Sequence, residues 1–176
     1  MIYLIEHGET ALDARGQSHG GRDEALNRKG RRQAVLLGQR LLRQRPHVAV
    51  IYHSPARRAA QTARIAGAVA DIPPQVAPEL APLHSGLLGA GDERTVARRL
   101  QPYLDNPERV LPDGESVATW RERHASFMRR VLAQGTPAAM VTHSNVIGSV
   151  RGGTHGIRRA ITRPPKSAEI AARAQA

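Results

Sequence analysis

The stretch IYLIEHGET, Ile2 to Thr10, decides the fold of this chain. Its first four residues are apolar, which predicts a short buried strand. The strand runs into Glu6 and His7 and then into Gly8, so polar groups stand where it ends. A buried strand that ends on a histidine and a glycine is typical of a functional site. The acid immediately before the histidine is unexpected, because the chain as a whole is strongly basic.

Two further apolar stretches end in the same way. Residues 48–52 run into the His-Ser pair at 53–54, and residues 138–142 run into the His-Ser pair at 143–144. Helical patterns separate the strands, which predicts an α/β fold with three layers, α/β/α, around a mostly parallel central sheet. Because the carboxyl ends of parallel strands meet at one edge of a sheet, we expect these polar groups to converge there.

Helical patterns fill the spaces between the strands. Helices are predicted over 27–46, from Ser54 to about Ala70, over 92–103 and over 115–132. Asn27 is expected to cap the first of them, and Ser54 and Pro55 are expected to be the N-cap and first-turn residue of the second. Residues 11–24 are expected to be a loop, and residues 71–82, with four prolines, cannot be a regular helix.

The chain is expected to divide into two parts. Residues 1–150 carry the strand and helix patterns of one α/β domain, which is a common domain size. Residues 151–176 are basic and hold almost no large apolar residue, so a disordered or peripheral C-terminal tail is expected. A short helix from Ser167 to Gln175 is the alternative.

Composition narrows the classes of partner. The chain holds 26 lysines and arginines against 15 acids, a net charge of +11 that attracts anions such as a phosphorylated substrate. Aromatic residues make up only 3%, too few for the stacking platforms of single-strand nucleic-acid binders, so we do not expect a nucleic-acid partner. No apolar stretch is long enough to span a membrane, and no signal peptide is recognised, so no membrane partner and a cytoplasmic location are expected. The oligomeric state stays open.

The polar groups at the strand ends suit phosphoryl transfer. A neutral imidazole can attack phosphorus and form a covalent intermediate. Arg57 and Arg58 supply forked donors that match phosphate oxygens, and helix N-termini add backbone N–H groups. Gly8 is expected to let the backbone approach the phosphate closely.

Several motifs, in the right order, resemble those of the histidine phosphatase superfamily, also called the phosphoglycerate mutase-like family. The family opens on a strand followed by Arg-His-Gly, and this chain has Glu6-His7-Gly8. Three later segments are similar to the family's SPLxRAxQTA, GGES and SHGGVI motifs: SPARRAAQTA at 54–63, PDGES at 112–116 and VTHSNVI at 141–147. The resemblance covers about residues 1–150 and implies a phosphoglycerate mutase-like fold.

The resemblance also implies roles for individual residues. His7 corresponds to the nucleophile that becomes phosphohistidine. Arg58 and His143 correspond to groups that hold the phosphoryl oxygens, and Ser144 is expected to bind phosphate beside them. The resemblance implies a small phosphorylated substrate, no metal and no organic cofactor.

Two acids depart from the family pattern. Glu6 takes the position of a phosphate-binding arginine, so a bidentate donor is lost and a negative charge is added. The lost charge-assisted contact is worth about 1.5–3 kcal/mol, which is roughly ten- to a hundredfold in rate. Glu6 is also expected to raise the pKa of His7. Asp13 stands at the expected phosphate site, where many relatives have an asparagine, and adds a second negative charge.

The general acid has more than one candidate. In the family frame L-x-E-x-x-x-G, Pro82 takes the place of the catalytic glutamate. In the alternative frame L-x-P-W-D-x-G, the acid position falls on His84, and a histidine can donate a proton near neutral pH. Glu79 is the rival candidate, and the remaining interpretation is that no dedicated acid is present.

Three functions follow from these residues. The first is a phosphatase that hydrolyses a phosphomonoester through a phosphohistidine on His7, with reduced or altered activity because of Glu6. The second is a catalytically weak or inactive member of the family that binds a phosphorylated ligand or a protein partner. The third, favoured least, is a basic nucleic-acid-associated protein. A phosphatase is favoured over a mutase, because mutases of this family carry insertions that a chain of 176 residues leaves little room for.

Overall fold

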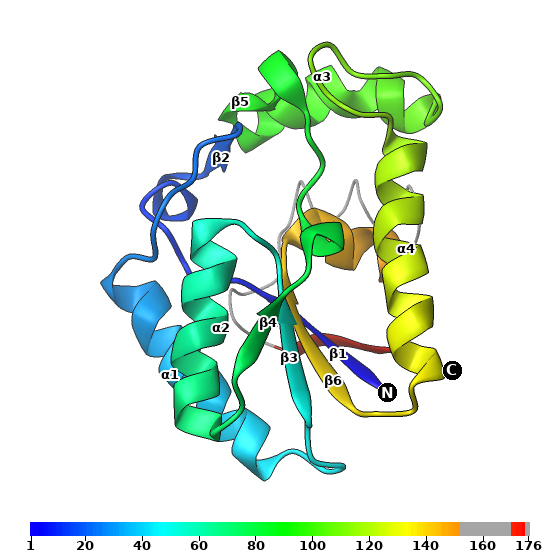
Figure 1. The fold of residues 1–176 in the computed structure, drawn as a ribbon. Coiled ribbons are helices and arrows are strands. Elements are labelled where there is room, and N and C mark those ends of the chain that lie inside the picture. The colour runs from blue at the N-terminus through cyan, green and yellow to red at the C-terminus, as the bar shows by residue number, and fades with distance from the viewer. Residues whose placement is uncertain (152–169, 175–176) are drawn as a thin grey trace.

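The computed structural model describes residues 1–151 and 170–174. Its central sheet has five strands in the order β4-β3-β6-β1-β7 (Figure 1). The strands are β1 (Ile2–Glu6), β3 (Val50–His53), β4 (Pro74–Val76), β6 (Ala138–Thr142) and β7 (Ile170–Ala174). The first four of these run parallel, and β7 lies antiparallel to β1 at the sheet edge. The predicted α/β fold with a mostly parallel sheet is therefore confirmed.

The predicted helices are present, with small shifts at their ends. They are α1 (Arg28–Arg43), α2 (Arg57–Ala70), α3 (Glu93–Asp105) and α4 (Val117–Ala133), and residues 144–151 are also helical. Asn27 caps α1 as expected, and its side chain accepts a hydrogen bond from the Gly30 amide at 2.8 Å. The expected cap of α2 is wrong. Ala56, not Ser54, is the N-cap residue, and the Ser54 hydroxyl accepts from both the Ala56 amide at 3.3 Å and His143 Nε2 at 2.8 Å.

The two faces of the sheet carry two separate hydrophobic clusters. Tyr3 and Ile5 of β1 pack with buried residues of α1 and α2. Ile2 and Leu4 point to the opposite face and pack in the cluster that holds Trp120 of α4. This alternation is the period of two expected along a strand, and it makes the three layers seen in Figure 1. Because both faces of β1 are covered, the strand is held firmly up to its polar end.

A small second sheet lies beyond the carboxyl ends of the main strands. It pairs β2 (Gln17–His19) antiparallel with β5 (Ala90–Asp92), close to α3 (Figure 1). The expectation that residues 11–24 are all loop is therefore wrong, since they contain β2 and a short 3-10 turn, Asp13–Arg15. Each strand has three residues and a partner distant in sequence, so no alternation of apolar residues marks it.

The end of the chain adds to the sheet. Residues 170–174 form β7 beside β1, so the alternative of a short helix from Ser167 to Gln175 is wrong. Backbone pairing with the other edge of β1 supplies hydrogen bonds that local helix propensity does not predict. The rest of the expected tail, residues 152–169 and 175–176, lies outside the described residues, and a domain boundary at residue 150 stays a prediction. Within 1–151 and 170–174, no helix has the length and apolar character to cross a bilayer.

Candidate active site

A cavity of about 960 Å³ opens at the carboxyl ends of the central strands. Its lining includes polar side chains that follow β1, β3 and β6 in the chain: Glu6, His7, Arg58, His143 and Ser144. These segments are distant in sequence, and the parallel sheet brings them to one edge. Of the residues singled out in the sequence, Asp13 and His84 also line this cavity.

His7 is buried and held in one tautomer. Its Nδ1 lies 2.8 Å from the Gly8 carbonyl oxygen, which can only accept, so Nδ1 carries the proton and donates it. Its Nε2 accepts a hydrogen bond from Arg58 Nε at 3.1 Å and therefore presents a lone pair. Burial, with the nearby Arg58 charge second, lowers the pKa of His7 to about 3. The expectation that Glu6 raises the pKa of His7 is wrong, because loss of solvent around the ring outweighs any neighbouring acid.

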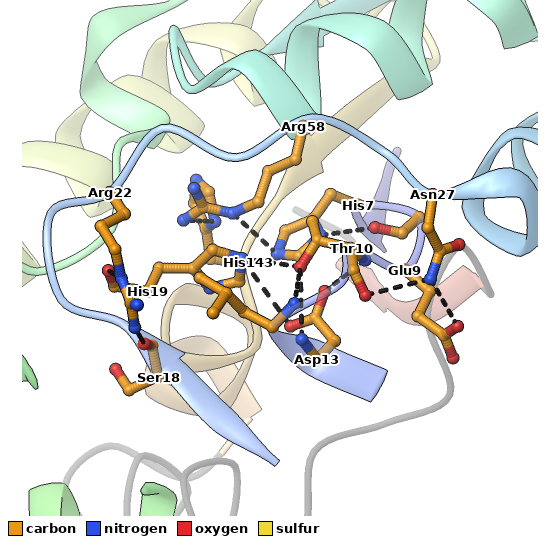
Figure 2. A network of polar contacts seen from close by, with 12 residues as sticks. His7, Glu9, Thr10, Asp13, Ser18, His19, Arg22, Asn27, Arg58 and His143 are labelled. Atoms are coloured by element: carbon orange, nitrogen blue, oxygen red, sulfur yellow. Dashed lines mark hydrogen bonds and ion pairs between the residues drawn. The ribbon is translucent and has the colours of Figure 1, made fainter. Parts of the chain in front are cut away.

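Arg58 joins the two histidines from the first turn of α2. Its Nε donates to His7, and its second terminal nitrogen lies 3.2 Å from His143 Nδ1 (Figure 2). Since a guanidinium can only donate, Nδ1 of His143 accepts, and its Nε2 then donates to Ser54 Oγ at 2.8 Å. Burial lowers the pKa of His143 well below its ordinary value, so this ring is also neutral. Burial lowers the pKa of Arg58 only to about 10, so its charge remains at neutral pH.

Gly8 packs tightly against α1, and its expected close approach to phosphate stays a prediction. A Cβ on Gly8 would lie 2.6 Å from the Gly30 carbonyl oxygen at the start of α1. The glycine therefore lets the turn after β1 pack directly against that helix. The Gly8 amide donates to Thr62 Oγ1 at 2.9 Å, and Thr62 donates to the Arg58 carbonyl at 2.7 Å. These contacts fix the strand end that bears His7 against the helix that bears Arg58.

Glu6 is a buried acid inside the cavity. Its side chain lines the cavity, the residue is 5% exposed, and Oε2 has no hydrogen-bond partner among the described residues. Burial is the main reason that the pKa of Glu6 rises to about 8, with smaller contributions from Asp13 and Glu93, while a hydrogen bond from Ser144 opposes the rise. At neutral pH the carboxyl group is therefore mostly protonated. The negative charge predicted from the sequence develops only as the pH rises through about 8.

The carboxyl group of Asp13 makes its contacts within residues 10–19, close to it in the chain. Its Oδ2 accepts the Thr10 amide at 2.7 Å, and its Oδ1 lies 3.8 Å from His19 Nε2. The first contact closes the turn that follows β1. Asp13 thus has a clear local role, and it also places a carboxylate in the cavity wall.

Several polar residues of the cavity were missed in the sequence. Among them are His19, which ends β2, and Glu93, which begins α3. No spacing rule marks His19, because the pairing of β2 with β5 brings it to the site. Burial and the nearby Asp13 charge raise the pKa of Glu93. The carboxyl groups of Glu93 and Asp13 therefore repel each other when both are ionised.

The candidates for the general acid differ in whether they line the cavity. His84 is exposed and lines the cavity, and its backbone amide donates to Glu115 Oε1 at 3.0 Å. Glu79 is not among the residues that line the cavity and pairs with Arg130 at 2.7 Å. The structure therefore does not place Glu79 to act as the acid. Pro82 lines the cavity but carries no proton to donate.

The sequence pattern of the histidine phosphatase superfamily (branch 1) matches residues 2–166. The chain belongs to this superfamily. The family match extends past residue 150, where the motifs recognised in the sequence end.

Relatives in this superfamily carry names from two kinds of enzyme. The chain is 29% identical to an acid phosphatase of Mycobacterium tuberculosis, with 90% of this chain and 89% of that protein covered. It is 28% identical to a probable phosphoglycerate mutase GpmB of Yersinia enterocolitica, with 84% and 71% covered. It is also 28% identical to a metal-independent phosphoserine phosphatase of Arabidopsis thaliana, with 85% and 66% covered.

Solved structures of the superfamily agree with the fold. The structure of the open reading frame Rv3214 of Mycobacterium tuberculosis has a TM-score of 0.73 at 27% identity, covering 95% of this chain and 86% of that one. TTHB049 of Thermus thermophilus has a TM-score of 0.66 at 29% identity, covering 85% and 81%. The names of the relatives support phosphohydrolase chemistry as a class, and the individual roles of the site residues rest on the geometry described above.

Proposed function

We propose that this protein is a phosphatase that hydrolyses a small phosphomonoester through a phosphohistidine on His7. The observation that carries the proposal is the state of His7: a buried, neutral ring whose Nδ1 is held by the Gly8 carbonyl and whose Nε2 lone pair faces Arg58. An imidazole in this state is a nucleophile that needs no prior deprotonation. The names of the relatives, two of them phosphatases, support the same class of substrate.

In the first step, the Nε2 lone pair of His7 attacks phosphorus and the bond from phosphorus to the ester oxygen breaks. Arg58, which already contacts both histidine rings, turns its N–H donors to the phosphoryl oxygens and offsets their charge in the transition state. Ser144, at the start of the helix over 144–151, adds a hydroxyl to the same wall. The departing oxygen needs a proton, and His84 is the proposed donor because it is exposed in the cavity wall.

In the second step, a water oxygen attacks the phosphohistidine and the bond from phosphorus to Nε2 breaks. The water proton returns to the group that donated in the first step, and inorganic phosphate leaves. His7 regains its lone pair, and the Gly8 carbonyl keeps the ring in the same tautomer through both steps. Because Glu6 offers one proton where an arginine would offer a charged fork, we expect the rate to be reduced.

The second candidate is a family member that binds a phosphorylated ligand or a protein partner and turns over slowly or not at all. The observation that favours it is the acid wall of Glu6, Asp13 and Glu93 in the cavity that also holds Arg58. A nucleic-acid-associated role is weaker, because the cavity is the most developed feature of the described residues and stacking aromatic residues are few.

Hydrolysis of p-nitrophenyl phosphate and of a panel of small phosphomonoesters, from about pH 5 to about pH 9, separates the two candidates. We expect slow, saturable release of phosphate that is lost in His7→Ala. The matched control is His47→Ala, an exposed histidine that is not among the cavity-lining residues, which should match the native rate. Phosphate release that persists in His7→Ala, or none in the native protein with any ester, would overturn the phosphatase proposal.

A further inference from the structure

Three side chains of the cavity gather potential metal-ligand atoms at one point. His7, Asp13 and His19 each offer one ligand atom, and the three atoms all lie within 4.8 Å of one another. His7 follows β1, Asp13 begins the short 3-10 turn, and His19 ends β2, so they come from three separate pieces of structure (Figure 2). His19 has no part in the phosphatase mechanism proposed above.

The Nε2 nitrogens of both rings carry lone pairs rather than protons. Nε2 of His7 accepts from Arg58, as described above. Nε2 of His19 lies 3.2 Å from Thr10 Oγ1, which already accepts the backbone amides of Leu12 and Asp13. The Thr10 hydroxyl proton is therefore free to point at His19, and the His19 nitrogen accepts it. Neutral imidazole nitrogens of this kind are the usual ligands of Zn²⁺.

The charge around this point is mixed, because Asp13 supplies an acid to the cluster while Arg58 keeps its positive charge 3.1 Å from Nε2 of His7. Glu6 and Glu93 line the cavity together with Asp13. Oε2 of Glu6, in a residue that is 5% exposed, has no hydrogen-bond partner among the residues described. The sequence motifs predict no metal, so this acid wall is a property of this chain rather than of the motifs.

We propose that His7, Asp13 and His19 bind a divalent transition-metal ion of the Zn²⁺ type, and that this ion inhibits the phosphatase. Two imidazole nitrogens and one carboxylate oxygen are a ligand set found at zinc sites, with the fourth position left open to the cavity. The ion takes the Nε2 lone pair that attacks phosphorus, so metal and phosphoryl group exclude each other on His7. The inhibitory part rests on the proposed phosphatase function, and the binding part does not.

The site must close slightly to take the ion. Ligand atoms at tetrahedral Zn²⁺ lie about 3.3 Å apart, as follows from bond lengths of roughly 2.0–2.1 Å. Nε2 of His19 and Oδ1 of Asp13 are 3.8 Å apart and the widest pair of ligand atoms is within 4.8 Å, so the ligand atoms must move closer to one another. Arg58 must also release Nε2 of His7. We therefore expect binding in the micromolar range, as for an inhibitory ion, and not the tight binding of a resident structural zinc.

Isothermal titration calorimetry with Zn²⁺ alone tests the binding. We expect one saturable site in the native protein, about tenfold or more weaker in His19→Ala, which removes one of the three ligands. The matched control is His47→Ala, whose exposed histidine lies outside the ligand cluster and should leave the affinity unchanged. Asp13→Asn, which keeps an acceptor for the Thr10 amide, should also weaken binding without unfolding the loop. Equal affinity in His19→Ala and the native protein, or no saturable binding, would overturn the proposal.

The inhibitory part is tested with the same proteins and a phosphomonoester. Zn²⁺ should inhibit native hydrolysis competitively with substrate, and His19→Ala should need about tenfold more Zn²⁺ for the same inhibition. Mg²⁺, which prefers oxygen ligands, should not inhibit at the same concentrations. Inhibition that is unchanged in His19→Ala would contradict the assigned site. If the native protein hydrolyses no ester, the phosphatase proposal fails, and calorimetry still decides whether the metal site exists.

Discussion

The two walls of the cavity differ in kind. One wall, formed by Arg58 and His143, is part of a continuous chain of hydrogen bonds that runs from His7 to the buried Ser54 behind it. The other, formed by Glu6, Asp13 and Glu93, brings three acids together and leaves a buried carboxyl oxygen of Glu6 without a partner among the described residues. The first wall contains the residues that the resemblance predicts to hold a phosphoryl group, and the second contains the two acids, Glu6 and Asp13, predicted to depart from the family pattern. The proposed nucleophile and its arginine contact are thus both present, while the acids lower the positive charge available to attract a phosphate dianion.

The largest effect is expected from breaking the first wall. Arg58→Ala removes the donors that contact His7 and His143, and loss of one such donor to a transition state costs about 100- to 1,000-fold in kcat. Steady-state hydrolysis of a phosphomonoester measures it. The neighbouring Arg57 is exposed and its backbone amide bonds to Asp23, so Arg57→Ala serves as the control and should change kcat by less than about twofold. Equal losses in the two variants would mean that Arg58 acts through net charge alone.

Placing a cation in the second wall should have the next largest effect on the rate of hydrolysis. Glu6→Arg places a bidentate donor where the carboxyl group now lies, and a charge-assisted contact of about 1.5–3 kcal/mol corresponds to roughly a ten- to hundredfold gain in kcat/KM. Glu6→Gln fills the same volume without the charge and should give only a small gain below pH 7. Kinetics of both variants beside the native protein would show this. A loss of activity in Glu6→Arg would contradict the idea that Glu6 holds the rate down.

Stability should also depend on pH through Glu6. Its pKa is raised from 4.5 to about 8 in the folded protein, so the unfolded chain releases this proton first as the pH rises. Folded-state stability from this group is complete below about pH 4.5 and is lost progressively up to about pH 8. Glu6→Gln lacks this loss, and after relaxation around the buried charge we expect it to be about 1–2 kcal/mol more stable than the native protein at pH 9. Urea unfolding at acidic and alkaline pH measures the difference, and a gap that does not widen with pH would contradict it.

A smaller effect is expected at Asp13. Asp13→Asn removes one negative charge from the second wall but keeps an oxygen that accepts the Thr10 amide, so the turn should survive. We expect about a three- to tenfold gain in kcat/KM, close to one unit charge at a partly solvated site. Circular dichroism and thermal unfolding would confirm that the loop is intact, and a fall in kcat/KM with normal stability would show that the Asp13 charge assists the reaction.

The sequence was sufficient to predict most of the first wall and little of the second. Arg58 and His143 follow apolar strands in recognisable motifs, so strand order alone predicts that they meet. His19 and Glu93 reach the cavity through the three-residue pairing of β2 with β5 and the start of α3, which leave no periodic signal. The protonation state of Glu6 depends on how deeply the side chain is buried, and no spacing in the sequence measures burial.

Contacts between distant segments also explain two wrong predictions from the sequence, one at the start of α2 and one at residues 170–174. Ser54 has the residue type and the following proline of a helix cap, but α2 begins only at Arg57, and the shorter contact of the Ser54 hydroxyl is with His143 from the neighbouring strand end. Residues 170–174 have a helix-compatible composition, but β1 offers them a free edge. In both cases a contact between distant segments outweighs a local preference.

Detection of a phosphohistidine on His7 is the most direct test of the proposed mechanism. The native protein is mixed with a phosphomonoester, quenched within milliseconds under alkaline conditions that preserve phosphohistidine, digested and examined by mass spectrometry. We predict one phosphoryl group on the peptide that carries His7, formed and lost at rates compatible with turnover, and none on that peptide in Arg58→Ala at the same time point. Hydrolysis that proceeds at its full rate with no phosphoryl group on His7 would contradict the mechanism.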